Sequence, residues 1–258
     1  MLRAFLYALI AAVSIAATAL IVAPAQWIAS WVGRATGNHV TLAEARGSVW
    51  RGQASVVLSP GAAAGIGRIS LPEPLSWQLS PWRLLVGTVD LTLTHPSALP
   101  QPLRVQTNLS GRVELSGTTV RLPAAVLAGL GAPFNTIKPG GVLSLTWQRL
   151  DLQPGRLQGD IVGEWQFASS SLTTVAPMGH FRLLAEGGFP ETRLSLTTLS
   201  GPLELSGDGT IGAGGSLRFR GRAAVQPGAD DATRAQLAGL VSLLGRRDGD
   251  SAILNFGQ

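Results

Sequence analysis

Residues 103–116 read LRVQTNLSGRVELS, and this stretch decides the fold class. The odd positions from Leu103 to Leu109 alternate with polar side chains, and the alternation resumes at Val113 and Leu115 after a glycine. A period of two places alternate side chains of an extended chain on opposite faces. The stretch therefore predicts two consecutive strands, each with one apolar (dry) face and one polar face that is exposed to solvent (wet).

The same alternation recurs along most of the chain, which also has 32 glycines suited to turns between short strands. Further strands are expected near residues 69–71, 75–79, 89–93, 143–152, 157–167, 181–185, 194–196, 203–211, 217–222 and 252–256. Strands with one dry face are typical of antiparallel sheets. Because neighbouring strands twist by about −20 to −25°, roughly a dozen of them must curl. We expect a mainly β protein with one long curved antiparallel sheet, shaped as a half-open barrel or taco.

One strand changes the parity of its apolar positions. The apolar residues of 143–147 hold odd positions, whereas Leu150 and Leu152 hold even ones. Such a change needs a β-bulge or a break in the strand, which we expect at Gln148–Arg149.

Two short helices should interrupt or cover the sheet. At residues 124–130 a preceding proline favours a helix start, and Gly129 and Gly131 favour its end. In residues 231–244 the apolar positions 237, 240, 241 and 244 share one helical face, and Asp230 or Asp231 can cap the helix. We expect both helices to plug the ends of the sheet or to cover its edges.

The N-terminal stretch, residues 4–23, is apolar, and no charged residue lies between Arg3 and Arg34. About 20 such residues span a bilayer as a helix, so we assign residues 1–25 to a transmembrane anchor. Trp27 and Trp31 would lie at the membrane interface, and residues 26–46 would form a juxtamembrane helix and loop.

A cleavable signal peptide is the alternative for the same residues. Residues 23–25 read Ala-Pro-Ala and resemble a cleavage site, which would leave Gln26 as the first residue. The apolar stretch is longer than the roughly 7–15 residues of a signal peptide, which favours an uncleaved anchor.

The net charge of +5 and the pI of about 11.1 suggest a nucleic-acid binder, but the arginines are spread along the chain. Spread arginines are typical of wet strand faces, so we expect no nucleic-acid partner. Arg218, Arg220 and Arg222 alternate with less polar residues and should project from one face. They are either paired with cross-strand groups at 204, 206 and 208 or form a contact site for an acidic partner or lipid headgroups.

No set of residues predicts catalysis, a cofactor or a metal site. The chain has no cysteine, and His39, His95 and His180 are far apart in sequence, outside the spacing of metal ligands. Residues 248–250 read Asp-Gly-Asp but lack the later ligands of a calcium loop. We therefore expect a protein that is not an enzyme.

A series of short motifs occurs in a fixed order along the chain. They are Pro24-Ala25 with Trp27, GSVWRG at 47–52, Leu71-Pro72 with Trp77, Leu122-Pro123-Ala124, Gly140-Gly141 with Leu145 and Trp147, Trp165 before Pro177-Met178-Gly179, Gly201-Pro202-Leu203, and LLGRR at 243–247. In this order and spacing the chain resembles the type II secretion system protein N family of Gram-negative bacteria. Met178 stands where leucine is expected in the family.

The resemblance implies a non-enzymatic accessory component in the bacterial inner membrane, with residues 47–258 as a periplasmic β domain. Its implied partners are the inner-membrane platform proteins of the secretion system and the outer-membrane secretin. The strand pattern alone leaves a second function open. A dry concave face could hold an acyl chain, as in a lipid-handling protein.

Overall fold

The computed structural model describes residues 7, 18, 22–59, 68–130, 134–154 and 156–257. Most of the predicted anchor, residues 1–25, lies outside these residues. Among the described helices, none has both the length and the hydrophobicity needed to cross a bilayer.

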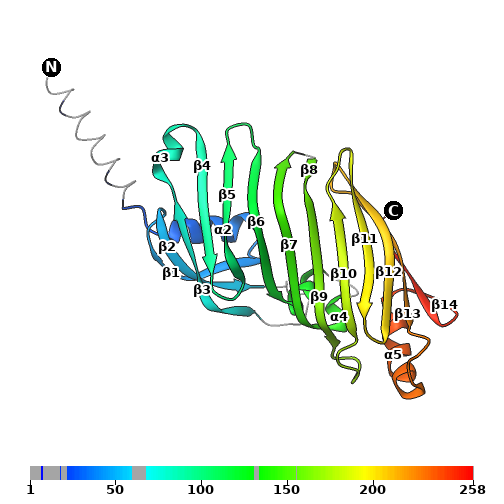
Figure 1. Cartoon of the computed structure of the whole chain (residues 1–258). Helices are drawn as coiled ribbons and strands as arrows, with labels where there is room; N and C mark the ends of the chain where they lie inside the picture. Colours follow the sequence, from blue (N-terminus) through cyan, green and yellow to red (C-terminus); the bar gives the residue numbers. More distant parts are fainter. Residues whose placement is uncertain are drawn as a thin grey trace.

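The described residues form fifteen strands in one antiparallel sheet (Figure 1). The strands are β1 (Val40–Gly47), β2 (Arg51–Leu58), β3 (Ile69–Leu79), β4 (Thr88–His95), β5 (Leu99–Asn108), β6 (Val113–Pro123), β7 (Pro139–Gln153), β8 (Arg156–Gln158), β9 (Asp160–Ser170), β10 (Gly179–Glu186), β11 (Glu191–Ser200), β12 (Leu203–Gly212), β13 (Leu217–Val225), β14 (Arg246–Asp248) and β15 (Ser251–Phe256). They follow the chain order from β1 to β13, then β15 and β14, with β8 paired only to β7. The sheet curves but does not close, and β1 and β14 lie at its two ends. The expected long antiparallel sheet is confirmed.

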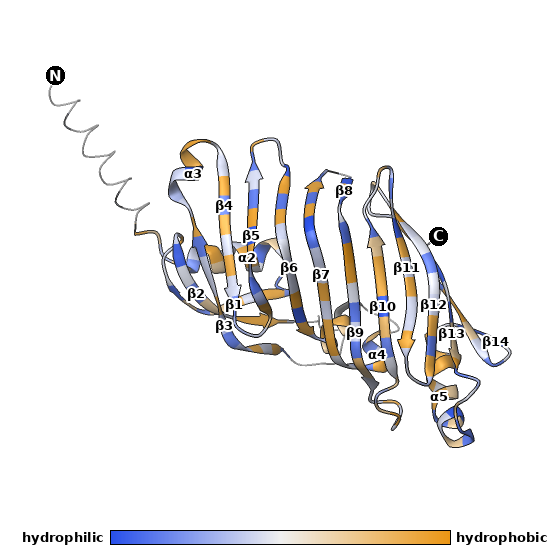
Figure 2. Ribbon diagram, in the orientation of Figure 1, coloured by the Kyte–Doolittle hydropathy of each residue, from blue (hydrophilic) through white to orange (hydrophobic). Residues whose placement is uncertain are grey.

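A helix covers the C-terminal part of the sheet. The side chain of Asp230 accepts a hydrogen bond from the Thr233 backbone N–H at 2.7 Å and so starts α5 (Asp231–Leu244). Leu237 and Leu240 of this helix are fully buried in a cluster with Phe181 and Leu205 of the sheet. Figure 2 shows the apolar positions alternating along these strands. We call the sheet face on which α5 packs the apolar face.

Two smaller helical segments lie between β6 and β7. They are the 3₁₀ helix η2 (Ala124–Leu130) and α4 (Phe134–Ile137). Ile137 joins the same buried cluster as α5. The helices predicted at 124–130 and 231–244 are therefore present.

The other end of the sheet has its own apolar cluster, beneath the helix α2 (Gln26–Ala35). Trp77 of β3 is buried there with Ala54, and Ile28 of α2 packs against them. The Trp77 indole N–H donates to the carbonyls of Ser48 and Val49, each at 3.2 Å. These bonds join β3 to the turn between β1 and β2.

The sheet begins earlier than expected. Residues 40–47 form β1, although they belong mostly to the segment predicted as a juxtamembrane helix and loop. β1 and β2 pair from Val40↔Leu58 to Gly47↔Gly52, so residues 48–50 form the turn instead of a strand. Gly52 has no space for a side chain, because an added Cβ would overlap the Trp77 ring. The close contact with Trp77 explains why glycine stands at position 52 of the GSVWRG motif.

The predicted irregularity in β7 lies where expected, within one residue. β6 and β7 share one register from Val113↔Leu152 to Pro123↔Val142, but the Gly117–Gln148 pair is missing. A Cβ at Gly117 would overlap the Gln148 carbonyl. On the other side of β6, the Arg104 backbone N–H donates to the Ser116 hydroxyl at 2.8 Å. The regular backbone pairing of β6 is therefore interrupted at this point on both sides, with β5 and with β7.

Candidate interaction surfaces

Arg218, Arg220 and Arg222 project from one face of β13, and all three are exposed. In the β12–β13 register Arg220 lies directly opposite Asp208. None of the three side chains makes a hydrogen bond or ion pair with another described residue. The pairing with cross-strand groups that the sequence left open is therefore absent from the described residues.

The strand register adds two arginines that the sequence did not single out. Arg193 of β11 lies opposite Thr210, which in turn lies opposite Arg218. Arg246 of β14 lies opposite Ile253, the partner of Arg222. Both are exposed, and neither pairs with another described residue. We call the following set the arginine face: Arg193, Arg218, Arg220, Arg222 and Arg246.

A neighbouring pair shows that the same sheet can neutralise an arginine. Arg182 of β10 lies opposite Glu164 of β9, and their side chains form an ion pair at 2.8 Å. The hydrogen bond from Arg182, reinforced by one from Gln166, holds the pKa of the Glu164 carboxyl below its ordinary value of 4.5. On the arginine face Asp208 and Glu186 lie opposite arginines without such contacts. The guanidinium groups of the arginine face are therefore exposed to solvent without ion pairs to these two carboxylates.

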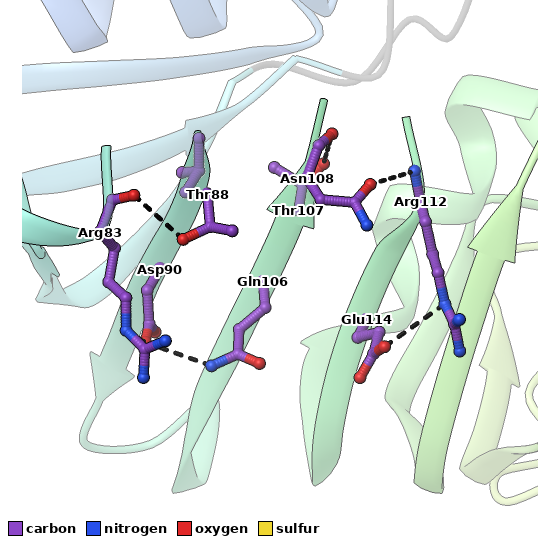
Figure 3. Close-up of a pocket in the computed structure, with 9 residues that line it drawn as sticks. Arg83, Thr88, Asp90, Gln106, Thr107, Asn108, Arg112 and Glu114 are labelled. Atoms are coloured by element: carbon purple, nitrogen blue, oxygen red, sulfur yellow. Dashed lines mark hydrogen bonds and ion pairs between the residues drawn. The ribbon is translucent and has the colours of Figure 1, made fainter. Parts of the chain in front are cut away.

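A second group of charges lies on β4 to β7 and is paired internally. Asp90 receives a hydrogen bond from Arg104 at 3.0 Å and another from Gln106 at 3.2 Å, and Arg83 lies 3.8 Å away. Arg83, Asp90 and Gln106 line a shallow pocket of about 180 Å³ (Figure 3).

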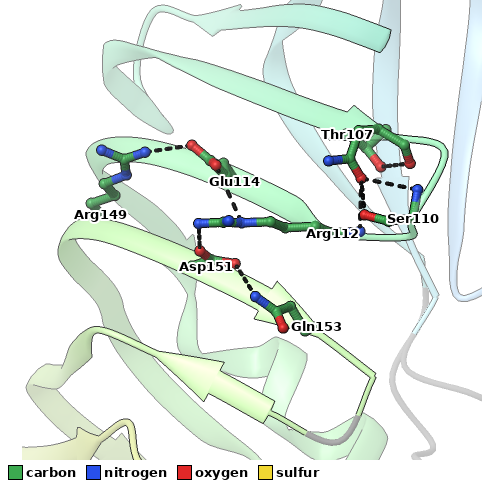
Figure 4. A network of polar contacts seen from close by, with 8 residues as sticks. Thr107, Ser110, Arg112, Glu114, Arg149, Asp151 and Gln153 are labelled. Carbon is green, nitrogen blue, oxygen red and sulfur yellow. Dashed lines mark hydrogen bonds and ion pairs between the residues drawn. The ribbon is translucent and has the colours of Figure 1, made fainter. Parts of the chain in front are cut away.

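The same network continues onto β7. Arg112 pairs with Asp151 and, at 3.3 Å, with Glu114, which also binds Arg149 at 2.5 Å (Figure 4). Since each arginine here has a carboxylate partner, the network offers little free charge to a ligand. We interpret it as a structural feature of the central strands.

The apolar face is only partly covered. Leu205 is 9% exposed in the cluster beneath α5, whereas Leu145 of β7 and Leu183 of β10 are 39% and 38% exposed. Leu145 and Leu183 both lie opposite Gly163, so they share one row of the sheet. If this face held an acyl chain, Leu145 would contact it and Leu205 would not. A polar residue at Leu205 would therefore disrupt the core instead of testing lipid binding.

The buried histidine does not form a catalytic arrangement. His95 accepts a hydrogen bond at Nδ1 from the Ala98 backbone N–H, at 3.0 Å. The Ser97 hydroxyl donates to Glu73, so the imidazole does not activate it. His39 lies in the bend before β1 and His180 lies on β10, and the described residues hold no group of three or more side chains that could bind a metal ion.

The segment before α2 is built into the domain. Ala23 and Ala25 are almost completely buried. The Val49 N–H donates to the Ala23 carbonyl at 2.9 Å, and the Ala25 N–H donates to the Gly47 carbonyl at 3.1 Å. Trp27 and Trp31 are exposed on α2, so both side chains are accessible to a partner or membrane.

A single open sheet with unpaired arginines and half-exposed leucines is typical of a protein that works through interaction surfaces. The chain belongs to the type II secretion system protein N family, whose model matches residues 38–254. The match begins just before β1 and ends within β15, so it covers the whole sheet apart from the last two residues of β15. Membership indicates a membrane-associated component of the secretion system that interacts with other components. Comparisons with curated proteins and with solved structures gave no match.

Proposed function

We propose that the protein is a non-enzymatic accessory component of the type II secretion system, held in the inner membrane by residues 1–25. Its sheet domain lies in the periplasm and supports export of folded proteins across the outer membrane. The observation that carries this proposal is the family match over residues 38–254.

The buried segment before α2 supports an uncleaved anchor. Cleavage between Ala25 and Gln26 would remove two nearly buried alanines and the hydrogen bonds to Val49 and Gly47. The folded domain would lose contacts that close its first hairpin. Trp27 and Trp31 would then lie where the chain leaves the bilayer, since tryptophan favours the headgroup layer.

We assign the arginine face as the contact for an acidic surface of the secretion system, on the inner-membrane platform or the secretin. Five exposed arginines without internal partners would raise the rate of encounter with an acidic partner and make the contact sensitive to salt. The contact would need no rearrangement of the sheet, because its side chains are already free.

A deletion strain tests the function. We expect secreted hydrolases to accumulate in the periplasm while the outer-membrane barrier stays intact, and the full chain to restore secretion. Arg220→Gln with Arg222→Gln should fail to restore it, although the protein level is normal. A matched control, Arg51→Gln with Arg121→Gln, removes the same charge from exposed positions elsewhere and should restore it. Equal behaviour of the two double variants would refute the role of the arginine face.

A second candidate, a lipid-handling protein, is favoured by the uncovered leucines of the apolar face. In that case the deletion strain would secrete hydrolases normally and have a leaky outer membrane. The protein purified from membranes would carry phospholipid, and Leu145→Asn would remove it. Retained hydrolases behind an intact barrier would exclude this candidate.

A further inference from the structure

The most exposed apolar residues of the domain gather at one tip. Between β3 and β4 the short helix α3 (Pro81–Leu85) exposes 76% of Trp82 and 77% of Leu85, and Val86 after it is equally open. Leu109, at the turn between β5 and β6, is 92% exposed. Large apolar side chains with so little cover mark an interaction site when they lie together.

These residues do lie together. Gly87 is the second residue after α3, and a Cβ built on it would come within 2.9 Å of a Leu109 methyl group. The turn of the β5–β6 hairpin therefore rests against the end of α3, and Figure 1 shows both at the same end of the strands. We call Trp82, Leu85, Val86 and Leu109 the α3 tip.

The α3 tip lies close to the point where the N-terminal stretch joins the domain. The Ala23 carbonyl accepts from Val49, and the carbonyl of the next residue, Trp50, accepts from the Leu79 N–H at 2.8 Å. Leu79 is the last residue of β3, immediately before the turn into α3. Two backbone hydrogen bonds thus connect the end of the uncharged stretch 4–23 to the base of the α3 tip.

We propose that the α3 tip inserts into the lipid bilayer beside the anchor, as a second membrane contact that fixes the orientation of the sheet. The proposal rests on the proposed membrane anchor. A protruding tip of tryptophan, leucine and valine suits the interface between headgroups and acyl chains, where tryptophan is enriched. Arg83, between Trp82 and Leu84, is more than half exposed but lies 3.8 Å from Asp90, so its charge is directed toward the sheet and the tip itself stays apolar.

The chain has no cysteine, so single cysteines can report the depth of chosen sites. Full-length protein carrying Leu85→Cys or Leu109→Cys is labelled with an environment-sensitive fluorophore. It is then reconstituted into vesicles of phosphatidylethanolamine and phosphatidylglycerol. We expect blue-shifted emission that lipids with a nitroxide on the acyl chain quench. The matched control is Leu243→Cys, a 52% exposed leucine of α5 at the opposite end of the strands, and its label should report water.

A second variant tests whether the apolar side chains of the α3 tip cause the blue shift. Trp82→Glu combined with Leu109→Glu changes only exposed side chains, so the domain should fold with an unchanged unfolding midpoint. The label at Leu85→Cys should then shift toward the emission seen in water.

The outcomes separate the two proposals. A water-like label at the tip, in protein that still resists alkaline extraction from the vesicles, overturns the inserted tip and leaves the anchor intact. Protein that is not retained by the vesicles overturns the anchor itself. A blue-shifted label that nitroxide lipids do not quench would mean that the tip is buried by a second copy of the chain, and it also refutes insertion.

Discussion

Replacing Leu205 and Leu145 separately with asparagine tests how far α5 covers the apolar face. Leu205 is 9% exposed within the cluster that includes Leu237, whereas Leu145 is 39% exposed. If the two positions differ as the structure indicates, the same chemical change should have very different costs.

The expected magnitudes follow from burial. Truncating a buried leucine costs about 2–5 kcal/mol, and an amide left without partners adds about 1–3 kcal/mol. Leu205→Asn should therefore lower the free energy of unfolding by about 3–8 kcal/mol, against a total of about 5–15 kcal/mol for a typical domain. Full burial of a leucine stabilises by about 1.5–3 kcal/mol, so Leu145→Asn should cost about 1–2 kcal/mol. Its amide can remain in contact with water.

The assay is equilibrium urea unfolding of the full-length protein in detergent micelles, followed by circular dichroism of the β-sheet band. Leu145→Asn should shift the midpoint modestly, and Leu205→Asn should abolish or nearly abolish the folded baseline. Equal losses for the two variants would contradict the reasoning, because they would mean that α5 does not distinguish the two positions. A loss above about 3 kcal/mol at Leu145 would mean that this part of the face is closed as a core.

Two further results are expected from local geometry and from pKa. Gly52→Ala should lower the free energy of unfolding by about 1–3 kcal/mol, because the new Cβ overlaps the Trp77 ring. The control, Gly214→Ala, adds a Cβ in open space and should change the free energy of unfolding little. Equal urea midpoints for the two variants would contradict this prediction. The hydrogen bond from the Thr233 backbone N–H holds the pKa of Asp230 below its ordinary value of 3.8, so its ionised form stabilises α5 above that value. This contribution is lost as the pH falls through the lowered pKa, and the neutral cap Asp230→Asn should not lose it. Urea titrations of both proteins from about pH 5 to about pH 2 should therefore show the wild type losing more stability than the variant.

The alternation of apolar and polar residues was enough to predict the sheet. A strand with one dry face has no stable position except against another apolar surface, so the pattern at 103–116 already implies an antiparallel sheet. The parity change near Gln148 could be placed for the same reason, because the period of two leaves no other way to change face. The helix at 231–244 was equally predictable from its capping aspartate and its apolar spacing.

Features that depend on contacts between distant residues could not be predicted. The β1–β2 turn is set by the fit of Gly52 against Trp77, which no local pattern reveals. Arg193 and Arg246 join Arg218 only through the strand register, since they come from separate strands. The leucines of α3 look like ordinary core residues in sequence, and only their exposure distinguishes them.

The arrangement of the surfaces along the sheet bears on the proposed role. The N-terminal stretch and the α3 tip join the sheet at β1 to β4, whereas the arginine face lies on β11 to β14. Fourteen strands follow one another across the sheet. At about 4.8 Å between neighbours this is roughly 60 Å along the curve, longer than a bilayer core is thick. A domain anchored at one end would therefore present its arginines well away from the anchor, where a partner in the periplasm can reach them. An arginine face intended for the headgroups of the same membrane would be better placed beside the anchor, so its position favours an acidic protein as the partner.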